Sequence, residues 1–458
     1  MNLQILACGL LLLFTSLASP VLQKLPVSTA MLYLGAGVAV GPFGLGWLDI
    51  DAVGDAAWLE TGAEVAVLVS LFVTGLKIDS RVSRAKWGIA LRLASLTMLL
   101  TITGFTLLGH YLLGLPWGLA LVLGATLAPT DPVLAADIQV KSPEDRDALR
   151  VALSGEAGLN DGSAFPFVML GLGWMGLHNI GPMGGRWLAI DVLWAVAVGV
   201  AVGWAVGQLV GRASARFQGW RPRVEPLSEF IAVGAIAASF GAAQALGGYG
   251  FLAVFVTGLG VRRGLEHAAG QVNTAADSVG NVLQFNGQLE RIVEFVLVIV
   301  VGAALAHVQP SWALAAFTVV ALGVVRPATV ALSIRGAVVS VRQRRLMGWF
   351  GIRGIGSIYY LAYAIQHGVA GEAATALASA VLTLVAASVV LHGLSVTPLM
   401  DHYDRRQRRD QARSGGGRGP GAKGSAAAPA LPVAPAGPAE PAEPAELASA
   451  TSPSAPPS

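Results

Sequence analysis

The chain has 458 residues, of which 54% are hydrophobic and only 12% are charged. Soluble domains carry about 25% charged residues, so a soluble protein of this composition could not cover its own surface. The single cysteine, Cys8, excludes an intrachain disulfide scaffold, and the 57 glycines do not follow the three-residue period of a collagen-like chain. The composition therefore indicates a polytopic membrane protein.

Thirteen apolar stretches follow one another along the chain, and most approach the 20 or so residues that a transmembrane helix needs. Their expected ranges are 3–19, 27–46, 58–76, 93–113, 117–140, 149–175, 187–210, 227–246, 249–261, 291–308, 311–334, 347–367 and 373–397. A transmembrane barrel would instead show segments of about ten residues with alternating polarity. The stretch 264–290 is amphipathic and is predicted to lie at the membrane interface. We expect an all-α polytopic membrane protein with about 13 transmembrane helices.

The basic residues predict the orientation of these spans, because cytoplasmic loops are enriched in Lys and Arg. No Lys or Arg precedes the stretch 3–19, which therefore favours a retained span over a signal peptide. If the N-terminus faces outward, almost all of the 30 basic residues fall in inward loops or in the C-terminal tail. The exceptions are Arg186, Arg291, Arg326 and Arg353. We expect the N-terminus outside, the C-terminus inside, and a location in the inner or plasma membrane.

The composition changes after about residue 400. A basic cluster at residues 405–409 is followed by a stretch rich in Gly, Ala, Pro, Glu and Ser at residues 414–458. Such a stretch cannot bury enough apolar surface to fold. Residues 1–400 are therefore the predicted transmembrane domain, and residues 401–458 are a predicted cytoplasmic tail that is basic and then disordered.

A shift of seven spans relates the first six spans to the last six with opposite orientation, which predicts inverted repeats. The fifth and twelfth spans correspond under this shift, and both contain helix-breaking sequences. The fifth has Thr130-Asp131-Pro132 in its middle, after Pro129, and the twelfth has the glycine-rich run 351–357. Proline removes a backbone donor, and transporters with inverted repeats bind their substrate where matching spans are broken near the midplane. We expect these two spans to cross as broken helices.

Three acids lie deep within the spans, where a carboxylate is costly and is usually functional. These are Asp131, Glu156 and Asp161. Glu156 and Asp161 are five residues apart, about 140° around a helix, so they cannot form a close pair, whereas Asn160 shares the face of Glu156. Two roles follow: one acid is paired with a buried base, and the other lines a cavity where proton and cation compete for it.

At these residues the sequence resembles the monovalent cation/proton antiporters of the CPA1 family, the NhaP and NHE type. The resemblance covers about residues 1–400. Its main motifs are Ala128–Val133, Glu156–Gly162 and Gly351–Gly354, with supporting matches at Gly250–Leu259 and Arg326-Pro327.

The resemblance implies a secondary active transporter that exchanges a cation for H⁺ by alternating access, without an enzyme activity or a cofactor. The expected cation is Na⁺, with K⁺ as the alternative and Li⁺ as a further candidate, and the exchange is expected to be electroneutral. The family also implies a homodimer in membrane lipid, with no nucleic-acid partner. A core bundle of about 93–175 and 311–397 would move against a dimerisation part of about 1–92 and 187–308.

The resemblance also assigns roles to single residues. Asp161 would carry the exchanged cation or proton. Asp131 and Thr130 would help to build the ion site, with Asp161 and Asp131 as ligands of the transported Na⁺. Asn160 is typical of the electroneutral branch, and Glu156 would form a structural ion pair with Arg353. The chain departs from its relatives at Ala157, where a serine is frequent, and at Val73-Thr74, where some relatives have an acid.

Two secondary candidates and two other classes of function remain. Arg326 is deep enough to need a partner, and a structural ion pair or a carbonyl-capping role is expected for it; Ser154 opens the motif of the sixth span. An intramembrane aspartyl protease could use Asp131 and Asp161, although its usual motifs are absent. A cation channel or ion-responsive sensor could use the same scaffold.

Overall fold

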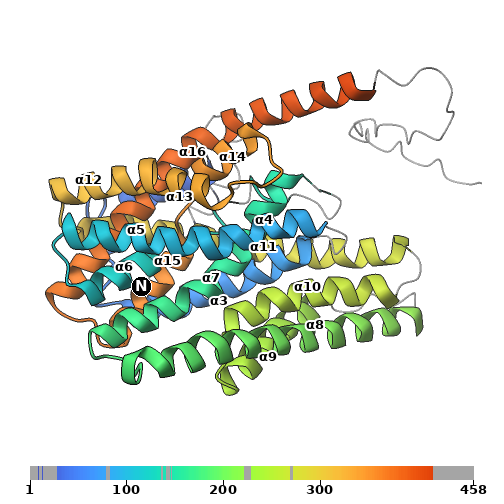
Figure 1. The fold of residues 1–458 in the computed structure, drawn as a ribbon, viewed down its shortest axis with the longest axis horizontal. Coiled ribbons are helices and arrows are strands. Elements are labelled where there is room, and N and C mark those ends of the chain that lie inside the picture. Colours follow the sequence, from blue (N-terminus) through green and yellow to red (C-terminus); the bar gives the residue numbers. More distant parts are fainter. Residues whose placement is uncertain are drawn as a thin grey trace, which may run out of the picture. The chain divides into compact units, whose positions relative to one another are not determined.

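The computed structural model describes residues 28–78, 83–135, 138–140, 145, 147–220, 228–268 and 272–415, together with Gly9 and Leu13. These residues form helices and no strand (Figure 1), which confirms the all-α class. The first predicted span, 3–19, lies almost wholly outside the described residues, as does most of the tail. Residues Met1–Asp404 form one compact unit, and Arg405–Ser458 form a second.

Helices occupy every expected span from the second onward, although several begin or end well outside the expected bounds. They are α2 (Thr29–Val40), α3 (Ala56–Lys77), α4 (Arg84–Arg92), α5 (Met98–Tyr111), α6 (Trp117–Leu127), α7 (Ala148–Trp174), α8 (Ala195–Trp220), α9 (Ser228–Ala245), α10 (Gly250–Ala268), α11 (Val272–Ala304), α12 (Trp312–Val320), α13 (Arg326–Ser333), α14 (Val341–Trp349), α15 (Ile355–Gln366) and α16 (Glu372–Gly415). Within the described residues, five helical stretches are long and apolar enough to cross a membrane. These are 56–77, 85–111, 182–216, 312–333 and 372–410.

Two predicted spans are interrupted where the sequence predicted breaks. α6 ends at Leu127 and gives way to non-helical chain, and residues 350–354 separate α14 from α15. α15 packs against both α6 and α7, and the labels of the three helices lie close together in Figure 1. The interruptions are therefore brought into one region of the protein core.

The stretch 264–290 belongs to two longer helices, because α10 continues to Ala268 and α11 runs without a break from Val272 to Ala304. Its placement at the membrane interface stays a prediction. The amphipathic pattern belongs to the end of α10 and to the first turns of a 33-residue helix. A pattern of polar and apolar residues on a helix does not by itself distinguish a helix that lies in the interface from one that extends beyond the membrane.

Small residues allow α8 and α10 to pack closely along their length, and the two helices run side by side in Figure 1. Gly203 and Gly207 recur at four-residue spacing on the contact face of α8. A Cβ atom at Gly203 would lie 2.2 Å from the backbone oxygen of Ala253, and one at Gly207 would lie 2.6 Å from that of Thr257. Stripes of small residues are the usual means by which membrane helices approach one another.

The fourth and eleventh spans also correspond under the seven-span shift, and both contain a π-helical segment. These segments are Leu93–Thr97 and Ala321–Val325. Two hydroxyl pairs join the spans: Thr97 contacts Ser333, and the Thr101 and Thr329 hydroxyls are 3.1 Å apart. π-Helical segments are rare in proteins, and those that do occur are often found at functional sites. Here the second of them leads directly into Arg326, the first residue of α13.

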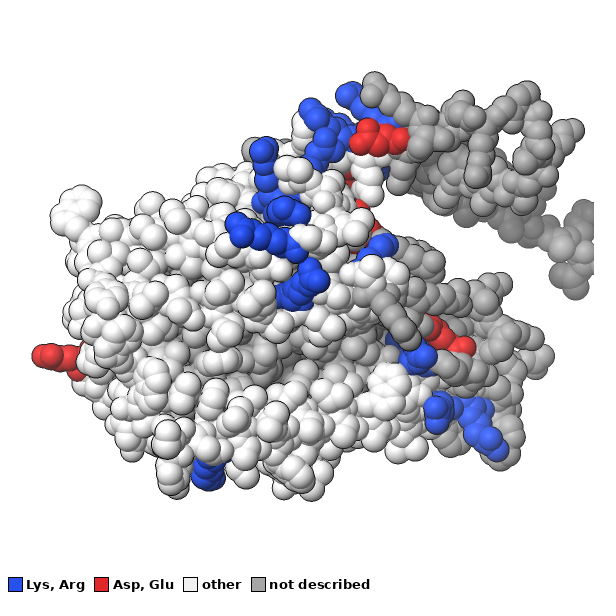
Figure 2. Space-filling view, viewed as in Figure 1, with Lys and Arg blue, Asp and Glu red and all other residues white. Residues whose placement is uncertain are grey.

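Charged residues of the compact unit gather at the end where α7 begins. The Asp147 carboxylate caps α7 by accepting hydrogen bonds from the Leu149 and Arg150 amides, and the Tyr403 hydroxyl donates to it at 2.8 Å. Arg150 binds Asp404 at 2.8 Å. On the face shown in Figure 2, Lys and Arg are concentrated toward this end, and the broad middle is almost uncharged.

Candidate functional site

Asp131 joins the two interrupted spans. Its backbone N–H donates to the Ile352 carbonyl at 2.8 Å, within the break of the twelfth span. Its Oδ1 accepts from the amides of Val133 (2.8 Å) and Leu134 (3.1 Å), and its Oδ2 accepts from the amide of Ile355, the first residue of α15. The first amides of a helix have no partner within the helix. The carboxylate of Asp131 therefore satisfies backbone donors on both sides of the crossing.

Asp161 has the opposite surroundings, although it is equally buried. Its side chain lies on α7 with 1% exposure, and neither of its carboxylate oxygens has a hydrogen-bond partner among the described residues. Gly356 on α15 faces it so closely that a Cβ atom there would lie 2.9 Å from Oδ1. A carboxylate that is buried without donors is costly. The arrangement favours a group that either carries a proton or holds a cation.

Further oxygen atoms without partners lie on the same elements. Asn160 donates its amide N–H to the Thr130 hydroxyl at 2.8 Å, which leaves its Oδ1 without a partner, and the buried Ser357 Oγ also has none among the described residues. Neutral oxygens of this kind can replace the hydration shell of a cation. The helices that carry or face the Asp161 carboxylate therefore also carry neutral oxygen atoms without partners. The described residues contain no group of three His, Cys, Asp or Glu side chains that could hold a metal ion.

Two residues near the site were missed as ion-site candidates in the sequence. Ser357 is the third residue of α15, and Tyr360 lies about one turn further along the same helix. The Tyr360 hydroxyl donates to the backbone oxygen of Asp161, which fixes α15 against α7. Their position in the sequence could have indicated them. Both are polar residues that follow a break in an apolar span, and such residues fall within the first turns of the next half-helix.

The structural ion pair differs from the one expected. Glu156 binds Arg326 through two hydrogen bonds, at 2.5 Å from Nη1 to Oε1 and 2.8 Å from Nη2 to Oε2, and both side chains are almost fully buried. Arg326 also reaches the carbonyl oxygens of Met347 (3.3 Å) and Phe350 (3.4 Å) at the end of α14. The pairing of Glu156 with Arg353 is therefore corrected, because the two-pronged guanidinium of Arg326 occupies the carboxylate.

Arg353 instead binds backbone oxygens. It has no exposed surface, and its guanidinium donates to the carbonyls of Leu127, at 2.5 Å, and Gly351. It also lies 5.7 Å from the centre of the Phe105 ring. Leu127 is the last residue of α6 and Gly351 lies in the second break, so Arg353 satisfies carbonyl groups at both interruptions. Its role is complementary to that of Asp131, which satisfies the amides.

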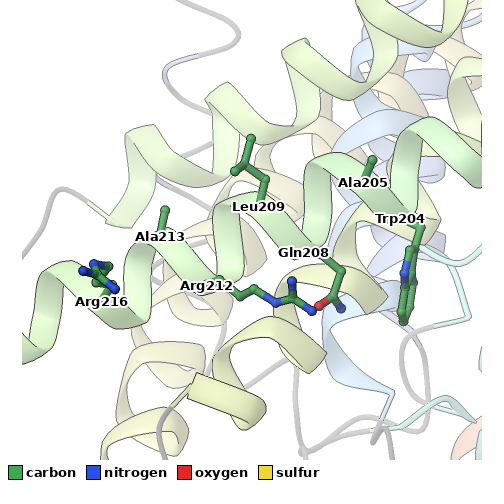
Figure 3. Close-up of a pocket in the computed structure, with 7 residues that line it drawn as sticks. All are labelled: Trp204, Ala205, Gln208, Leu209, Arg212, Ala213 and Arg216. Atoms are coloured by element: carbon green, nitrogen blue, oxygen red, sulfur yellow. The ribbon is translucent and has the colours of Figure 1, made fainter.

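The remaining candidate lies further from the free carboxylate. The Ser154 hydroxyl accepts a hydrogen bond from the Val140 amide at 3.0 Å, so it holds the chain that precedes α7. A surface pocket of about 520 Å³ is lined by residues of α8 alone, from Trp204 to Arg216 (Figure 3). None of its lining residues belongs to α7 or α15, and it is therefore distinct from the site around Asp161.

Comparisons with known proteins show sequence similarity to two cation/proton antiporters. A K⁺/H⁺ antiporter, NhaP of Alkalimonas amylolytica, is 26% identical over 409 residues, which are 87% of this chain and 66% of that protein. A Na⁺/H⁺ antiporter of Saccharomyces cerevisiae is 27% identical over 198 residues, 40% of this chain and 19% of its own length. The chain thus spans less than two thirds of each of these relatives, which are transporters and not enzymes.

The fold is similar to that of a solved structure. The sodium proton antiporter MjNhaP1 from Methanocaldococcus jannaschii, determined at pH 8, superposes with a TM-score of 0.68 at 17% identity, covering 87% of this chain and 99% of that one. The family model described as "Sodium/hydrogen exchanger, transmembrane" matches residues 9–402. Because this match takes in both interrupted spans and most of the chain, the protein belongs to the sodium/hydrogen exchanger family.

Proposed function

We propose that this protein exchanges a monovalent cation for H⁺ by alternating access, with Asp161 as the group that binds both. The observation that carries the proposal is the Asp161 carboxylate, which is buried beside the crossing of two interrupted spans, with neither oxygen bonded among the described residues. Ionised, it attracts a cation; protonated, it is neutral and releases the cation. One carboxylate cannot hold both at once, and this competition couples the two fluxes.

The surroundings of Asp161 support an electroneutral exchange. Asn160 precedes it where an electrogenic relative would have a second acid, and the Asp131 carboxylate is already committed to three backbone amides. A single carboxylate that exchanges one cation for one proton moves no net charge. Asp131 and Thr130 support the site from the other side of the crossing, where Thr130 holds Asn160 in place.

Na⁺ is the cation that we propose, with K⁺ as the alternative. The relatives described above are named for exchange of one or the other ion. Two oxygen ligands that occur in the wider family are missing here, at Ala157 and at Val73-Thr74. Selectivity then depends on neutral oxygens such as those of Asn160 and Ser357, which have no partner among the described residues.

The deciding experiment is a proton-flux assay in proteoliposomes. An outward or inward gradient of Na⁺, K⁺ or Li⁺ should move the internal pH within the time in which empty liposomes show no change. An imposed membrane potential should leave the electroneutral rate unchanged. Absence of pH movement with all three ions would refute the exchange, and a potential-driven current without proton movement would favour a channel instead. Peptide cleavage by the purified protein would favour the protease, although both carboxylate oxygens of Asp131 are already bound by backbone amides.

We further propose thirteen spans with the N-terminus outside and the C-terminus inside, in the inner or plasma membrane. The concentration of basic residues near the start of α7 supports the orientation (Figure 2). A homodimer is proposed on the resemblance alone, with a mobile core of about 93–175 and 311–397 and a dimerisation part of about 1–92 and 187–308. The first six spans and the last six are proposed to be inverted repeats. Cross-linking in native membranes and cysteine labelling of introduced loop residues test these assignments.

A further inference from the structure

The unwound segment of residues 350–354 is fully buried, so its backbone groups need hydrogen-bond partners within the protein. Three of them have partners outside α16. The Phe350 amide donates to the Leu346 carbonyl at 2.8 Å, the Ile352 carbonyl accepts from the Asp131 amide, and the Gly351 carbonyl accepts from the Arg353 side chain. Two more backbone groups, one just before the segment and one near its end, are bound by a helix that the exchange mechanism has not used.

That helix is α16. The Ser388 hydroxyl oxygen accepts from the Arg353 amide at 2.9 Å, and the His392 Nε2 lies 3.0 Å from the Trp349 carbonyl oxygen. Residues four apart share one face of a helix, so Ser388 and His392 both face the break. Their exposed fractions are 0% and 3%. The two side chains thus bind the last carbonyl before the break and an amide close to its end.

His392 contacts both the end of α14 and Ser388. The Trp349 carbonyl belongs to the last residue of α14 and has no acceptor role within that helix, so it accepts a hydrogen bond from the Nε2–H of His392. The Nδ1 lies 3.2 Å from the Ser388 hydroxyl and 2.9 Å from the Ser388 carbonyl. A chain of hydrogen-bond contacts therefore runs from the Arg353 amide through Ser388 and His392 to the Trp349 carbonyl.

We propose that Ser388 and His392 are positioning residues for transport, which hold the unwound segment in the shape that brings α15 to Asp131 and Asp161. The proposal rests on the exchange function proposed above. Two contacts connect the segment to the ion site. The Ile355 amide donates to the Asp131 carboxylate, and Gly356 lies against the Asp161 carboxylate. Both residues lie within three positions of Arg353. Loosening the segment moves these two contacts and so changes the ion site without touching any of its ligands.

The test compares deletion with conservative replacement. Ser388→Ala removes the acceptor of the Arg353 amide, and Ser388→Thr keeps it. His392→Phe removes both ring nitrogens, and His392→Gln keeps a donor near the Nε2 position. We expect Ser388→Ala and His392→Phe to raise the cation KM about three- to tenfold, the value of one or two hydrogen bonds, with a smaller change in kcat. Ser388→Thr and His392→Gln should restore the KM toward wild type.

A matched control, Ser395, lies about one turn beyond His392 on α16. Ser395 accepts a hydrogen bond at 3.0 Å from the indole N–H of the same Trp349, but not from the backbone of the break. Ser395→Ala should leave the KM unchanged. The double variant Ser388→Ala/His392→Phe should show less than the product of the two single fold-changes, because both belong to one chain of hydrogen bonds.

A second readout does not depend on transport. Hydrogen–deuterium exchange of a peptide that covers residues 349–356 should be faster in Ser388→Ala than in Ser395→Ala, even if the protein transported neither Na⁺ nor K⁺. Faster exchange in a protein without transport would sink the proposed function and keep the role of Ser388 in holding the segment. Equal KM values for Ser388→Ala and Ser388→Thr, together with unchanged deuterium uptake, would overturn the positioning role.

Discussion

Glu156 and Asp161 lie on the same helix, five residues apart and equally buried, yet their surroundings are opposite. Both oxygens of Glu156 are bound by the guanidinium of Arg326, and neither oxygen of Asp161 has a partner among the described residues. A carboxylate with a paired base keeps its charge and holds two helices together. A carboxylate without one is costly to bury, and a cation or a proton relieves that cost. Burial alone therefore does not identify the transport residue; the partners do.

The largest expected effect follows from breaking the paired acid. Glu156→Gln leaves the Arg326 charge buried without a counter-charge, which costs about 3–5 kcal/mol. We expect a marked fall in the unfolding temperature of the detergent-purified protein and a low yield of folded protein. The double variant Glu156→Leu/Arg326→Leu should recover most of the lost stability, because it removes both charges. A wild-type unfolding temperature for Glu156→Gln alone would show that the pair is not structural.

Asp161→Asn is the matched acid-to-amide change at the unpaired acid. The amide has no charge to desolvate, so we expect the unfolding temperature to equal or exceed that of the wild type. Exchange should fall to the level of empty liposomes with every cation, since the amide neither ionises nor releases a proton. Retained exchange in this variant would remove Asp161 from its proposed role, and strong destabilisation would mean that its carboxylate has a structural partner.

Asp131 stands between these two extremes, because its partners are backbone amides rather than a base. Asp131→Ala leaves the amides of Val133, Leu134 and Ile355 without an acceptor, and each such loss costs about 1–3 kcal/mol. Asp131→Asn keeps one acceptor oxygen and should lose about half as much. Thermal unfolding of the two variants side by side measures the difference. If they were equally stable, the carboxylate would not be the link between the interrupted spans.

The smallest expected effect comes from crowding the unpaired acid without replacing it. Gly356→Ala puts a methyl group 2.9 Å from the position of Asp161 Oδ1, so the carboxylate has to shift. We expect a several-fold higher KM for the cation and little change in unfolding temperature. Gly88→Ala on α4 is the control, since a Cβ atom there meets no neighbour within 4 Å. Identical KM values for the two variants would place the cation away from this face of Asp161.

Much of this molecule was predictable from local sequence patterns. The apolar stretches located the helices, and the prolines and glycines located both breaks, because a missing donor or side chain acts on the backbone where it occurs. The angle of about 140° between Glu156 and Asp161 around one helix predicted that the two acids have different surroundings, and the structure confirms it. The interfacial placement of the stretch 264–290 stays a prediction, because its polarity pattern fits two placements of a helix, one along the interface and one extending out of the membrane.

The sequence by itself determined the class of protein, the positions of the breaks and the three buried acids. Only the tertiary structure decided which group each acid meets. Glu156 binds Arg326, 170 positions away along the chain, while Arg353 turns to the carbonyls of Leu127 and Gly351. Both arginines were candidates for a buried partner of Glu156. The choice between them depends on how the helices are rotated and packed against one another, which the spacing of residues along one helix does not determine.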